Sequence, residues 1–356
     1  MAHGADLSKQ LAEQVRAAYG AREPLAIEGG ATKRFYTGAP LGAALAVTGH
    51  RGIVVHEPTE LVITARAGTR LAEIETALAA QGQMLAFEPP HFGESATLGG
   101  TIACGLSGPR RPFAGCAPDF VLGTTIINGK GEVLRFGGQV MKNVAGYDVS
   151  RLMTGSLGTL GVILDVSLKV LPRPAREITL TYCAEAAEAI RQMNTWARQP
   201  LPLSAACHHD GMLYVRLSGS DKGVRAAQSR LGGEVLAEGD GFWRDLREQR
   251  LAFFQSSKPL WRLSLPPATA PLELPGSCLI DWAGAQRWLL SDAPPAMITD
   301  VARRAGGYAV PFRNGPGGLS TFALLEPVTR ALSTEIRRAF DPHNLFGSGL
   351  GLAPAA

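Results

Sequence analysis

The sequence predicts an α+β protein made of two domains and a C-terminal segment. Three observations support this class. The chain has 356 residues, which at roughly 150 residues per domain allows two domains. Hydrophobic residues make up 46% of the chain and charged residues 19%, an ordinary globular usage that disfavours disordered, collagen-like and coiled-coil proteins. Finally, segments with strand alternation and segments with helical spacing follow one another along the chain.

The N-terminal residues predict a helix and then a strand that ends in a glycine turn. Leu7, Leu11 and Val15 recur at the four-residue spacing of one helix face. Residues 25–27 are apolar and run into the glycine-containing segment 28–33. This order is typical of a strand that opens onto a turn.

Three further patterns belong to the same expected domain. Residues 61–65 predict a strand, and residues 69–78 predict a helix that stops at Gly82. Residues 124–127 and 132–136 predict a hairpin, because a four-residue glycine turn separates the two apolar runs.

The expected domain boundaries follow from a change in these patterns. Residues 162–170 alternate between apolar and mostly polar side chains, and the strand stops at Pro172. We therefore expect a first domain over residues 1–175 and a separate α+β domain over residues 176–327. Residues 328–356 predict a last helix and a tail that returns to the first domain.

Charge and cysteine usage exclude several classes of protein. Thirty-five basic and 31 acidic residues give a net charge of +4 without a block of like charge, so a nucleic-acid partner is not expected. The 5 cysteines form no Cys-x-x-Cys pair, which argues against a disulfide framework, an iron–sulfur cluster or a structural zinc site. We expect no metal and a reducing, cytoplasmic location. The sequence shows no export signal and no run of 18 apolar residues, so any membrane contact is expected only through partners.

Glycine is in excess, and it gathers in three clusters that also contain Ser or Thr. The chain has 42 glycines, about 12% against a usual level of about 7%. The clusters cover residues 28–33, 95–101 and 155–161, and neither a Rossmann fingerprint nor a P-loop is present. Backbone N–H groups of such segments can point into one concavity that accepts phosphate oxygens, and Lys33 can neutralise a diphosphate. The clusters therefore predict a large phosphorylated cofactor held by several loops.

These clusters and the segments between them resemble the FAD-binding domain of the vanillyl-alcohol oxidase superfamily, also called the PCMH type. Six motifs carry the resemblance, in matching order and spacing: residues 29–33, 89–90, 97–103, 121–123, 142–148 and 155–161. The resemblance implies a PCMH-type FAD-binding domain of two subdomains and a smaller, ferredoxin-like α+β cap domain. FAD is the implied cofactor.

The resemblance also implies which residues hold FAD. The segments 29–33 and 97–101 would cradle the diphosphate, residues 158–163 would line the adenosine and diphosphate side, and residues 89–95 would approach the flavin. The implied cofactor-binding residues are Gly29, Gly30, Ala31, Thr32, Lys33, Pro89, Pro90, Ser95, Ala96, Thr97, Leu98, Gly99, Gly100, Thr101, Cys104, Gly105, Gly158, Gly161, Val162 and Ile163. The first glycine loop contains neither His nor Cys, so the FAD is expected to be non-covalent.

No catalytic base is identified from the sequence. Larger 2-hydroxy-acid dehydrogenases of the superfamily carry a histidine-rich motif in the cap, and this chain lacks it. His91, in the loop expected to face the flavin, is a weak catalytic candidate, and a loop histidine without a catalytic role is the alternative. The segment 208–210 is interpreted as a polar turn, with a metal or base role as the alternative, and Cys104 either touches the cofactor or is a small buried thiol.

Within the superfamily, the length of the chain and its segment 340–347 resemble the family of smaller FAD-binding subunits of bacterial glycolate oxidase. This family implies oxidation of glycolate, or a related 2-hydroxy acid, to glyoxylate, with electron transfer through flavin. Its implied partners are a larger FAD-binding subunit and an iron–sulfur subunit, through which the complex would lie at the inner membrane. Two alternatives stay open: an autonomous FAD-dependent 2-hydroxy-acid dehydrogenase, and a non-catalytic scaffold subunit with a vestigial flavin site.

Overall fold

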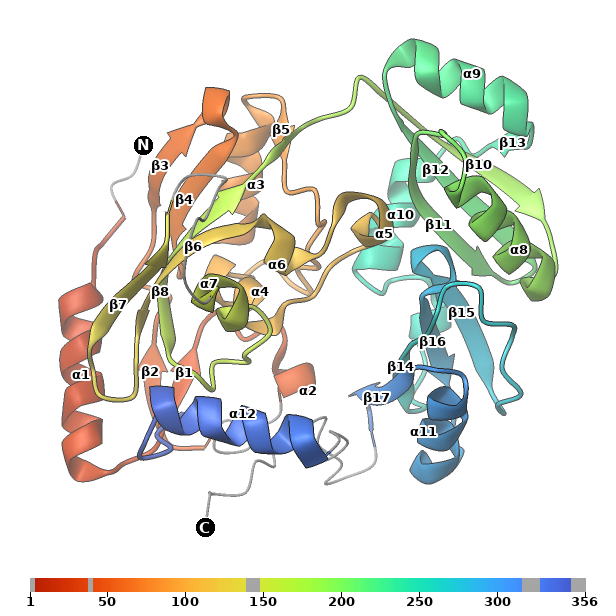
Figure 1. Ribbon diagram of the computed structural model, residues 1–356. Coiled ribbons are helices and arrows are strands. Elements are labelled where there is room, and N and C mark those ends of the chain that lie inside the picture. Colours follow the sequence, from red (N-terminus) through yellow and green to blue (C-terminus); the bar gives the residue numbers. More distant parts are fainter. Residues whose placement is uncertain (1–3, 38–40, 139–147, 316–326, 347–356) are drawn as a thin grey trace. The chain divides into compact units, whose positions relative to one another are not determined.

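The computed structural model describes residues 4–37, 41–138, 148–315 and 327–346 (Figure 1). It confirms the α+β class. The chain forms two compact units. The first unit comprises Met1–Leu106, Cys116–Pro172 and Ser320–Ala356, and the second comprises Ser107–Gly115 and Arg173–Leu319. The short segment 107–115 therefore belongs with the second unit, although it is flanked on both sides by residues of the first.

A five-stranded antiparallel sheet is the main layer of the first unit. Its strands, in spatial order, are β3 (Ile53–Glu57), β4 (Val62–Arg66), β8 (Val162–Lys169), β6 (Val121–Ile127) and β7 (Val133–Gly137). The strands expected near residues 61–65 and 162–170 and the glycine-turn hairpin are confirmed. Asn128 holds the hairpin turn, because its Oδ1 accepts hydrogen bonds of 3.0 Å from the backbone N–H groups of both Lys130 and Glu132.

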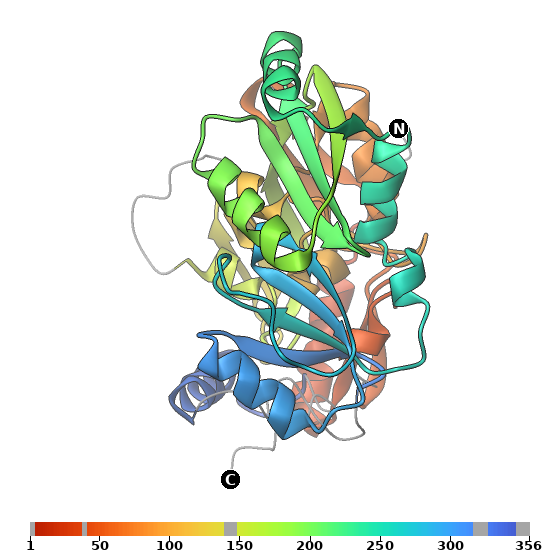
Figure 2. The same cartoon turned by 90° about the vertical axis from the view of Figure 1, so that its right-hand side faces the viewer.

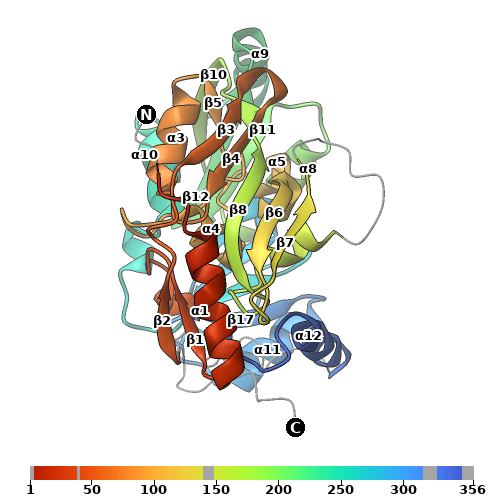
Figure 3. The same cartoon turned by 90° about the vertical axis from the view of Figure 1, so that its left-hand side faces the viewer.

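A second, smaller layer contains the N-terminal helix. The expected helix is α1 (Ser8–Ala21), which lies beside the parallel strands β1 (Leu25–Glu28) and β2 (Ala43–Ala46) (Figure 3). Leu11 and Val15 of α1 are buried in one cluster with Leu345 and Phe346 from the other end of the chain. The residues after the last helix thus complete the core against α1.

Short helices cover the remaining core of the first unit. The expected helix after β4 is α3 (Leu71–Ala79), which buries Leu71, Ile74 and Leu78 at helical spacing. The other helices and strands of the first unit are α2 (Arg34–Thr37), β5 (Gln83–Met84), α4 (Leu98–Cys104), α6 (Ala117–Phe120), α7 (Val149–Met153), β9 (Leu171–Pro172) and α12 (Pro327–Phe340). A single 3-10 turn, η1 (Pro58–Glu60), joins β3 to β4.

The second unit is built on an eight-stranded antiparallel sheet. Its spatial order is β13 (Glu234–Val235), β10 (Arg176–Cys183), β12 (Met212–Gly219), β11 (Leu203–His209), β15 (Ser277–Asp281), β16 (Gln286–Leu290), β14 (Leu260–Ser264) and β17 (Tyr308–Arg313). Its helices are α5 (Arg111–Ala114), α8 (Ala186–Ala197), α9 (Asp221–Leu231), α10 (Gly239–Arg247) and α11 (Pro295–Arg304), with the 3-10 turns η2 (Ala252–Phe254) and η3 (Trp282–Gly284) (Figure 2).

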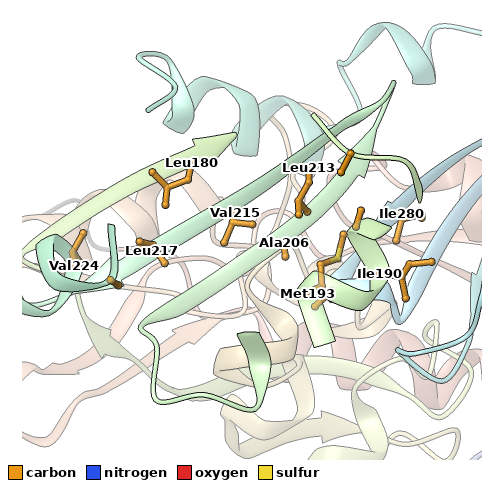
Figure 4. Close-up of a cluster of buried hydrophobic side chains, with 13 residues drawn as sticks. Leu180, Ile190, Met193, Ala206, Leu213, Val215, Leu217, Val224 and Ile280 are labelled. Atoms are coloured by element: carbon orange, nitrogen blue, oxygen red, sulfur yellow. The ribbon is translucent and has the colours of Figure 1, made fainter. Parts of the chain in front are cut away.

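The first half of this sheet has the ferredoxin-like order. The elements β10, α8, β11, β12, α9 and β13 follow one another along the chain, and β10 and β12 lie at the centre of their four strands. Apolar residues of α8 and α9, among them Ile190, Met193 and Val224, form one buried cluster with Leu213 and Leu217 of β12 (Figure 4). The second half, β14 to β17, has the same strand order. It lacks the helix after its first strand, where the proline-rich segment 265–276 connects β14 to β15.

Candidate functional site

The three glycine clusters meet at one cavity of the first unit. The cavity encloses about 170 Å³ and is lined by β1 and the loop after it, the first turn of α4, and the turn before β8. Twelve of the residues expected to bind a cofactor line it: Gly29, Gly30, Ala31, Thr32, Lys33, Thr97, Gly99, Gly100, Cys104, Gly158, Gly161 and Ile163. Segments far apart in the sequence thus converge on one cavity.

The first glycine loop presents backbone donors to this cavity. Among the described residues, the N–H groups of the four loop residues 29–32 have no protein acceptor. Ala31 adopts a left-handed conformation with φ of 56°, so successive N–H groups can converge on one point, as in an anion-binding nest. A row of unsatisfied N–H groups at a cavity suits the oxygens of a diphosphate.

Two contacts fasten this loop to the segment after Pro90. The Ser95 hydroxyl donates a 2.7 Å hydrogen bond to the carbonyl oxygen of Gly30. Lys33 is almost fully buried, and its ammonium donates to the His91 carbonyl at 3.3 Å and to the Thr32 hydroxyl at 3.4 Å. Lys33 therefore brings a positive charge to the wall of the cavity while it fixes the path of both loops.

The first turn of α4 forms the second wall. Thr97 is the N-cap of this helix, and its Oγ1 accepts a hydrogen bond of 3.4 Å from the N–H of Gly100. A Cβ atom on Gly99 would lie 2.7 Å from the Ala67 Cβ, so Gly99 permits close packing of the helix on β4. A Cβ atom on Gly100 would meet only the Thr97 hydroxyl, at 3.3 Å, so this glycine borders open space.

The third wall comes from the turn before β8. Gly161 has a φ of 146°, and a Cβ there would lie 2.5 Å from the Ile127 carbonyl oxygen. Gly158 also has a positive φ, of 78°, and faces Ile27 of β1. The turn is held on α4 because the Leu157 N–H donates to the Ala103 carbonyl at 2.8 Å.

Eight of the expected residues do not line the cavity and lie behind it or beside it: Pro89, Pro90, Ser95, Ala96, Leu98, Thr101, Gly105 and Val162. Ser95 acts on the first loop through its hydrogen bond to Gly30, and the Ala96 carbonyl accepts from the Leu71 N–H at 2.8 Å. The motif residues Lys142 and Asn143 lie outside the described residues.

The ring of His91 is turned toward α3 and is not part of the cavity lining. Its Nε2 lies 3.1 Å from Glu75 Oε2, and its backbone carbonyl accepts from Lys33. His91 thus takes part in holding the loops, and its catalytic role remains a weak prediction.

Several lining residues were not expected from the sequence. They are mostly the apolar residues of β1 and its neighbours: Leu25, Ala26, Ile27, Glu28, Arg34, Leu41, Val47, Ala67, Ala103 and Leu157. Glu28 and Arg34 form an ion pair of 2.6 Å across the ends of the first glycine loop. The sequence feature that could have identified them is the position of β1 directly before the first glycine loop.

The Cys104 thiol is protonated at neutral pH. Burial raises the pKa of Cys104 to about 11, although the nearby positive charge of Lys33 opposes the shift. A neutral thiol is a poor nucleophile.

The cap histidines have structural contacts. The His208 ring is hydrogen bonded to the Ala184 carbonyl at 2.8 Å, and the His209 ring packs edge-on against Phe253. Burial lowers the pKa of His209, which favours its neutral form. In the part of the chain that the structure describes, His, Cys, Asp and Glu side chains form no group able to hold a metal ion.

Comparisons with known proteins agree with this site. Residues 5–137 match the FAD binding domain family. The chain is 50% identical to glycolate oxidase subunit GlcE of Escherichia coli (strain K12) over 97% of both chains. It is 32% identical to glycolate oxidase subunit GlcD of Bacillus subtilis (strain 168), over 37% of this chain and 28% of that protein.

A solved structure shares the fold. Alkyldihydroxyacetonephosphate synthase superposes with a TM-score of 0.66 at 14% identity, covering 95% of this chain and 74% of the synthase. Because the sequence identity is so low, this structural similarity supports a shared PCMH-type fold and nothing more specific. Among the described residues, no helix is both long and apolar enough to span a bilayer. The near full-length identity to GlcE and the glycine-lined cavity place the chain in one family: it belongs to the GlcE family of glycolate oxidase subunits and carries a PCMH-type FAD-binding domain.

Proposed function

We propose that this chain is the FAD-carrying subunit of a glycolate oxidase complex and takes part in the oxidation of glycolate to glyoxylate. The observation that carries the proposal is the 50% identity to GlcE over 97% of both chains. The cavity supports it, since the loops that meet there present free N–H groups and a buried ammonium. When bound, FAD supplies a two-electron acceptor.

The described residues divide the work of binding this cofactor. We assign the N–H groups of the loop 29–32 and the Lys33 ammonium to the diphosphate, together with the first turn of α4. Gly158, Gly161 and Ile163 would line the adenosine and diphosphate side, where the missing Cβ lets Gly161 pack against the Ile127 backbone. The segment 89–95 would approach the flavin.

The partners in this proposal are a larger FAD-binding subunit and an iron–sulfur subunit. The 32% identity to GlcD over 37% of this chain supports a complex with a second, related subunit. Electrons would pass through flavin to these partners. A cytoplasmic location, with peripheral contact to the inner membrane through the complex, completes the proposal.

The visible absorption spectrum of the purified single chain tests the flavin assignment. We expect a flavin peak that persists on anaerobic addition of glycolate and is bleached by dithionite, because the chain would carry FAD for chemistry begun elsewhere in the complex. Bleaching by glycolate alone would instead identify an autonomous 2-hydroxy-acid dehydrogenase. A folded chain that binds no FAD when reconstituted would contradict the proposal and favour a scaffold subunit.

A further inference from the structure

Residues 341–346, directly after α12, form a turn that the carboxylate of Asp341 holds together. We call this segment the C-terminal turn. Asp341 is 3% exposed, and its two oxygens accept hydrogen bonds from the backbone N–H groups of Leu345 and Phe346, at 2.9 and 2.7 Å. Within the turn, Asn344 adopts a left-handed conformation with φ of 54°. One buried side chain therefore fixes the path of the backbone that follows it.

The C-terminal turn is fastened to two other elements of the first unit. The Phe340 carbonyl, just before the turn, accepts from the Gly129 N–H of the β6–β7 hairpin at 2.8 Å. Asp341 lies so close to this hairpin that a Cβ on Gly129 would be 2.6 Å from its Oδ1. The His343 ring stacks on the Tyr19 ring of α1 with centroids 4.2 Å apart. Neither α1 nor the hairpin turn contributes a residue to the cavity wall.

From this position the C-terminal turn reaches the first residue of β1. The Leu345 carbonyl accepts a 2.8 Å hydrogen bond from the Leu25 N–H. Leu345 and Phe346 are buried in one cluster with Leu25 and Val47. Leu25 and Val47 also line the cavity. The side chains that share a core with the C-terminal turn are thus part of the cavity wall.

The position of β1 depends on such contacts. Among the described residues, β1 pairs with one strand only, β2, and a two-stranded sheet is marginally stable by itself. β1 runs directly into the loop 29–32, whose N–H groups have no protein acceptor in the described part of the chain. A displacement of Leu25 would therefore displace the donors that we assign to the diphosphate.

We propose that Asp341 is a positioning residue for FAD: through the C-terminal turn it fixes β1 and hence the first glycine loop. The inference rests on the proposed function, because it takes FAD as the occupant of the cavity. Asp341, Leu345 and Phe346 do not line the cavity, so their effect acts through Leu25. Coupling between two sites is reciprocal, so bound FAD must in turn stabilise the C-terminal turn.

The first experiment titrates the full-length apo-chain carrying Asp341→Ala with FAD. The substitution leaves two buried N–H groups without their acceptor, so we expect the turn to loosen and FAD affinity to fall about tenfold. Asp341→Asn keeps one acceptor oxygen and should restore part of the affinity. Leu11→Ala is the matched control, because Leu11 is buried in the same cluster but belongs neither to the turn nor to the cavity wall. It should lower thermal stability and leave FAD affinity at the wild-type level.

The second measurement uses the wild-type chain and so does not depend on the folding of a variant. Hydrogen–deuterium exchange of the Leu345 and Phe346 N–H groups is followed with and without FAD. We expect FAD to slow their exchange more than it slows exchange within α1, because α1 packs on the same cluster but does not hydrogen bond to β1 in the described residues.

Each outcome has a distinct meaning. Unchanged FAD affinity of Asp341→Ala, or an equal loss in Leu11→Ala, would overturn the positioning role and leave the proposed function intact. Equal protection of the C-terminal turn and of α1 by FAD would overturn it as well, even where Asp341→Ala does not fold. A folded wild-type chain that binds no FAD would contradict the proposed function itself, and this inference with it.

Discussion

The hydroxyl of Ser95 donates a 2.7 Å hydrogen bond to the carbonyl oxygen of Gly30 and so joins two loops that lie 65 residues apart in the sequence. Only glycine permits the two backbones to lie this close, since a Cβ on Gly30 would lie 1.7 Å from the Ser95 carbonyl oxygen. The first cavity wall therefore depends on the second glycine cluster for its position.

Ser95→Ala should weaken FAD binding about fivefold without unfolding the chain. A net hydrogen bond contributes about 1 kcal/mol, and its loss would free the first loop to move. Titration of the apo-chain with FAD measures the effect. Ser333→Ala is the control, because that hydroxyl bonds to the Thr329 carbonyl of its own helix and does not join two loops. Equal FAD affinities for the wild-type chain and Ser95→Ala would show that this hydrogen bond does not position the loop.

Gly100→Val should abolish FAD binding in a chain that still folds. A Cβ at Gly100 meets only the Thr97 hydroxyl, at 3.3 Å, so the valine is accommodated by the protein and its methyl groups occupy the space beside the first turn of α4. By contrast, Gly30→Val should prevent the loops from closing at all. The far-ultraviolet circular dichroism spectrum and the flavin absorbance per chain separate the two effects. Stoichiometric FAD in folded Gly100→Val would refute the assignment of this wall.

Lys33→Met should reduce FAD affinity more than tenfold and make the remaining binding less sensitive to salt. A hydrogen bond from a charged group is worth about 1.5 to 3 kcal/mol, and the loss of Lys33 removes both its charge and its link to His91. Affinity measured at two ionic strengths tests this. A salt dependence equal to that of the wild-type chain would place the Lys33 charge away from the diphosphate.

The meeting of three glycine clusters could be predicted from the sequence because each cluster has a local signature of turn residues. The contacts that fasten the clusters could not. The link from Lys33 to His91 joins residues 58 positions apart, and nothing local at either residue marks the other as its partner. Ile27 lies in an apolar segment that resembles any buried strand, so its place in the cavity lining can be recognised only from the folded structure.

Nothing local in residues 107–115 indicates that they belong with the second unit. Arg110 and Arg111 look like a solvated pair of charges in the sequence. In the structure the Arg111 guanidinium lies 4.3 Å from the centre of the Trp282 ring, and the Trp282 indole donates to the Gly108 carbonyl at 3.0 Å. Both contacts depend on a residue more than 170 positions away.

Cys104 should resist alkylation at pH 8, whereas Cys183, which is exposed, should react. Burial raises the pKa of Cys104 from 9.0 to about 11, so very little thiolate is present in the folded chain. The folded state therefore holds this proton more tightly than the unfolded state does, and the stability it contributes is complete below about pH 9 and is lost as the pH rises toward 11. Mass spectrometry of the chain labelled with iodoacetamide checks the reactivity. Rapid labelling of Cys104 in the folded chain would contradict the burial argument.

Arg110→Leu should destabilise the second unit by about 2 kcal/mol, because it leaves the Glu177 carboxylate with a weaker partner. Arg110 is buried. Its guanidinium donates to Glu177 at 2.7 Å and to Ser218 at 3.1 Å, while Arg216 lies 3.7 Å from the same carboxylate.

The 5 tryptophans of the chain all lie in the second unit, so their fluorescence during urea unfolding reports on that unit, and flavin absorbance reports on the first. Arg191→Leu is the control, since its pair with Glu188 is exposed and such pairs contribute little. We expect the fluorescence midpoint of Arg110→Leu to fall clearly below that of Arg191→Leu. Coincident midpoints would show that the buried pair does not hold the segment 107–115 in the second unit.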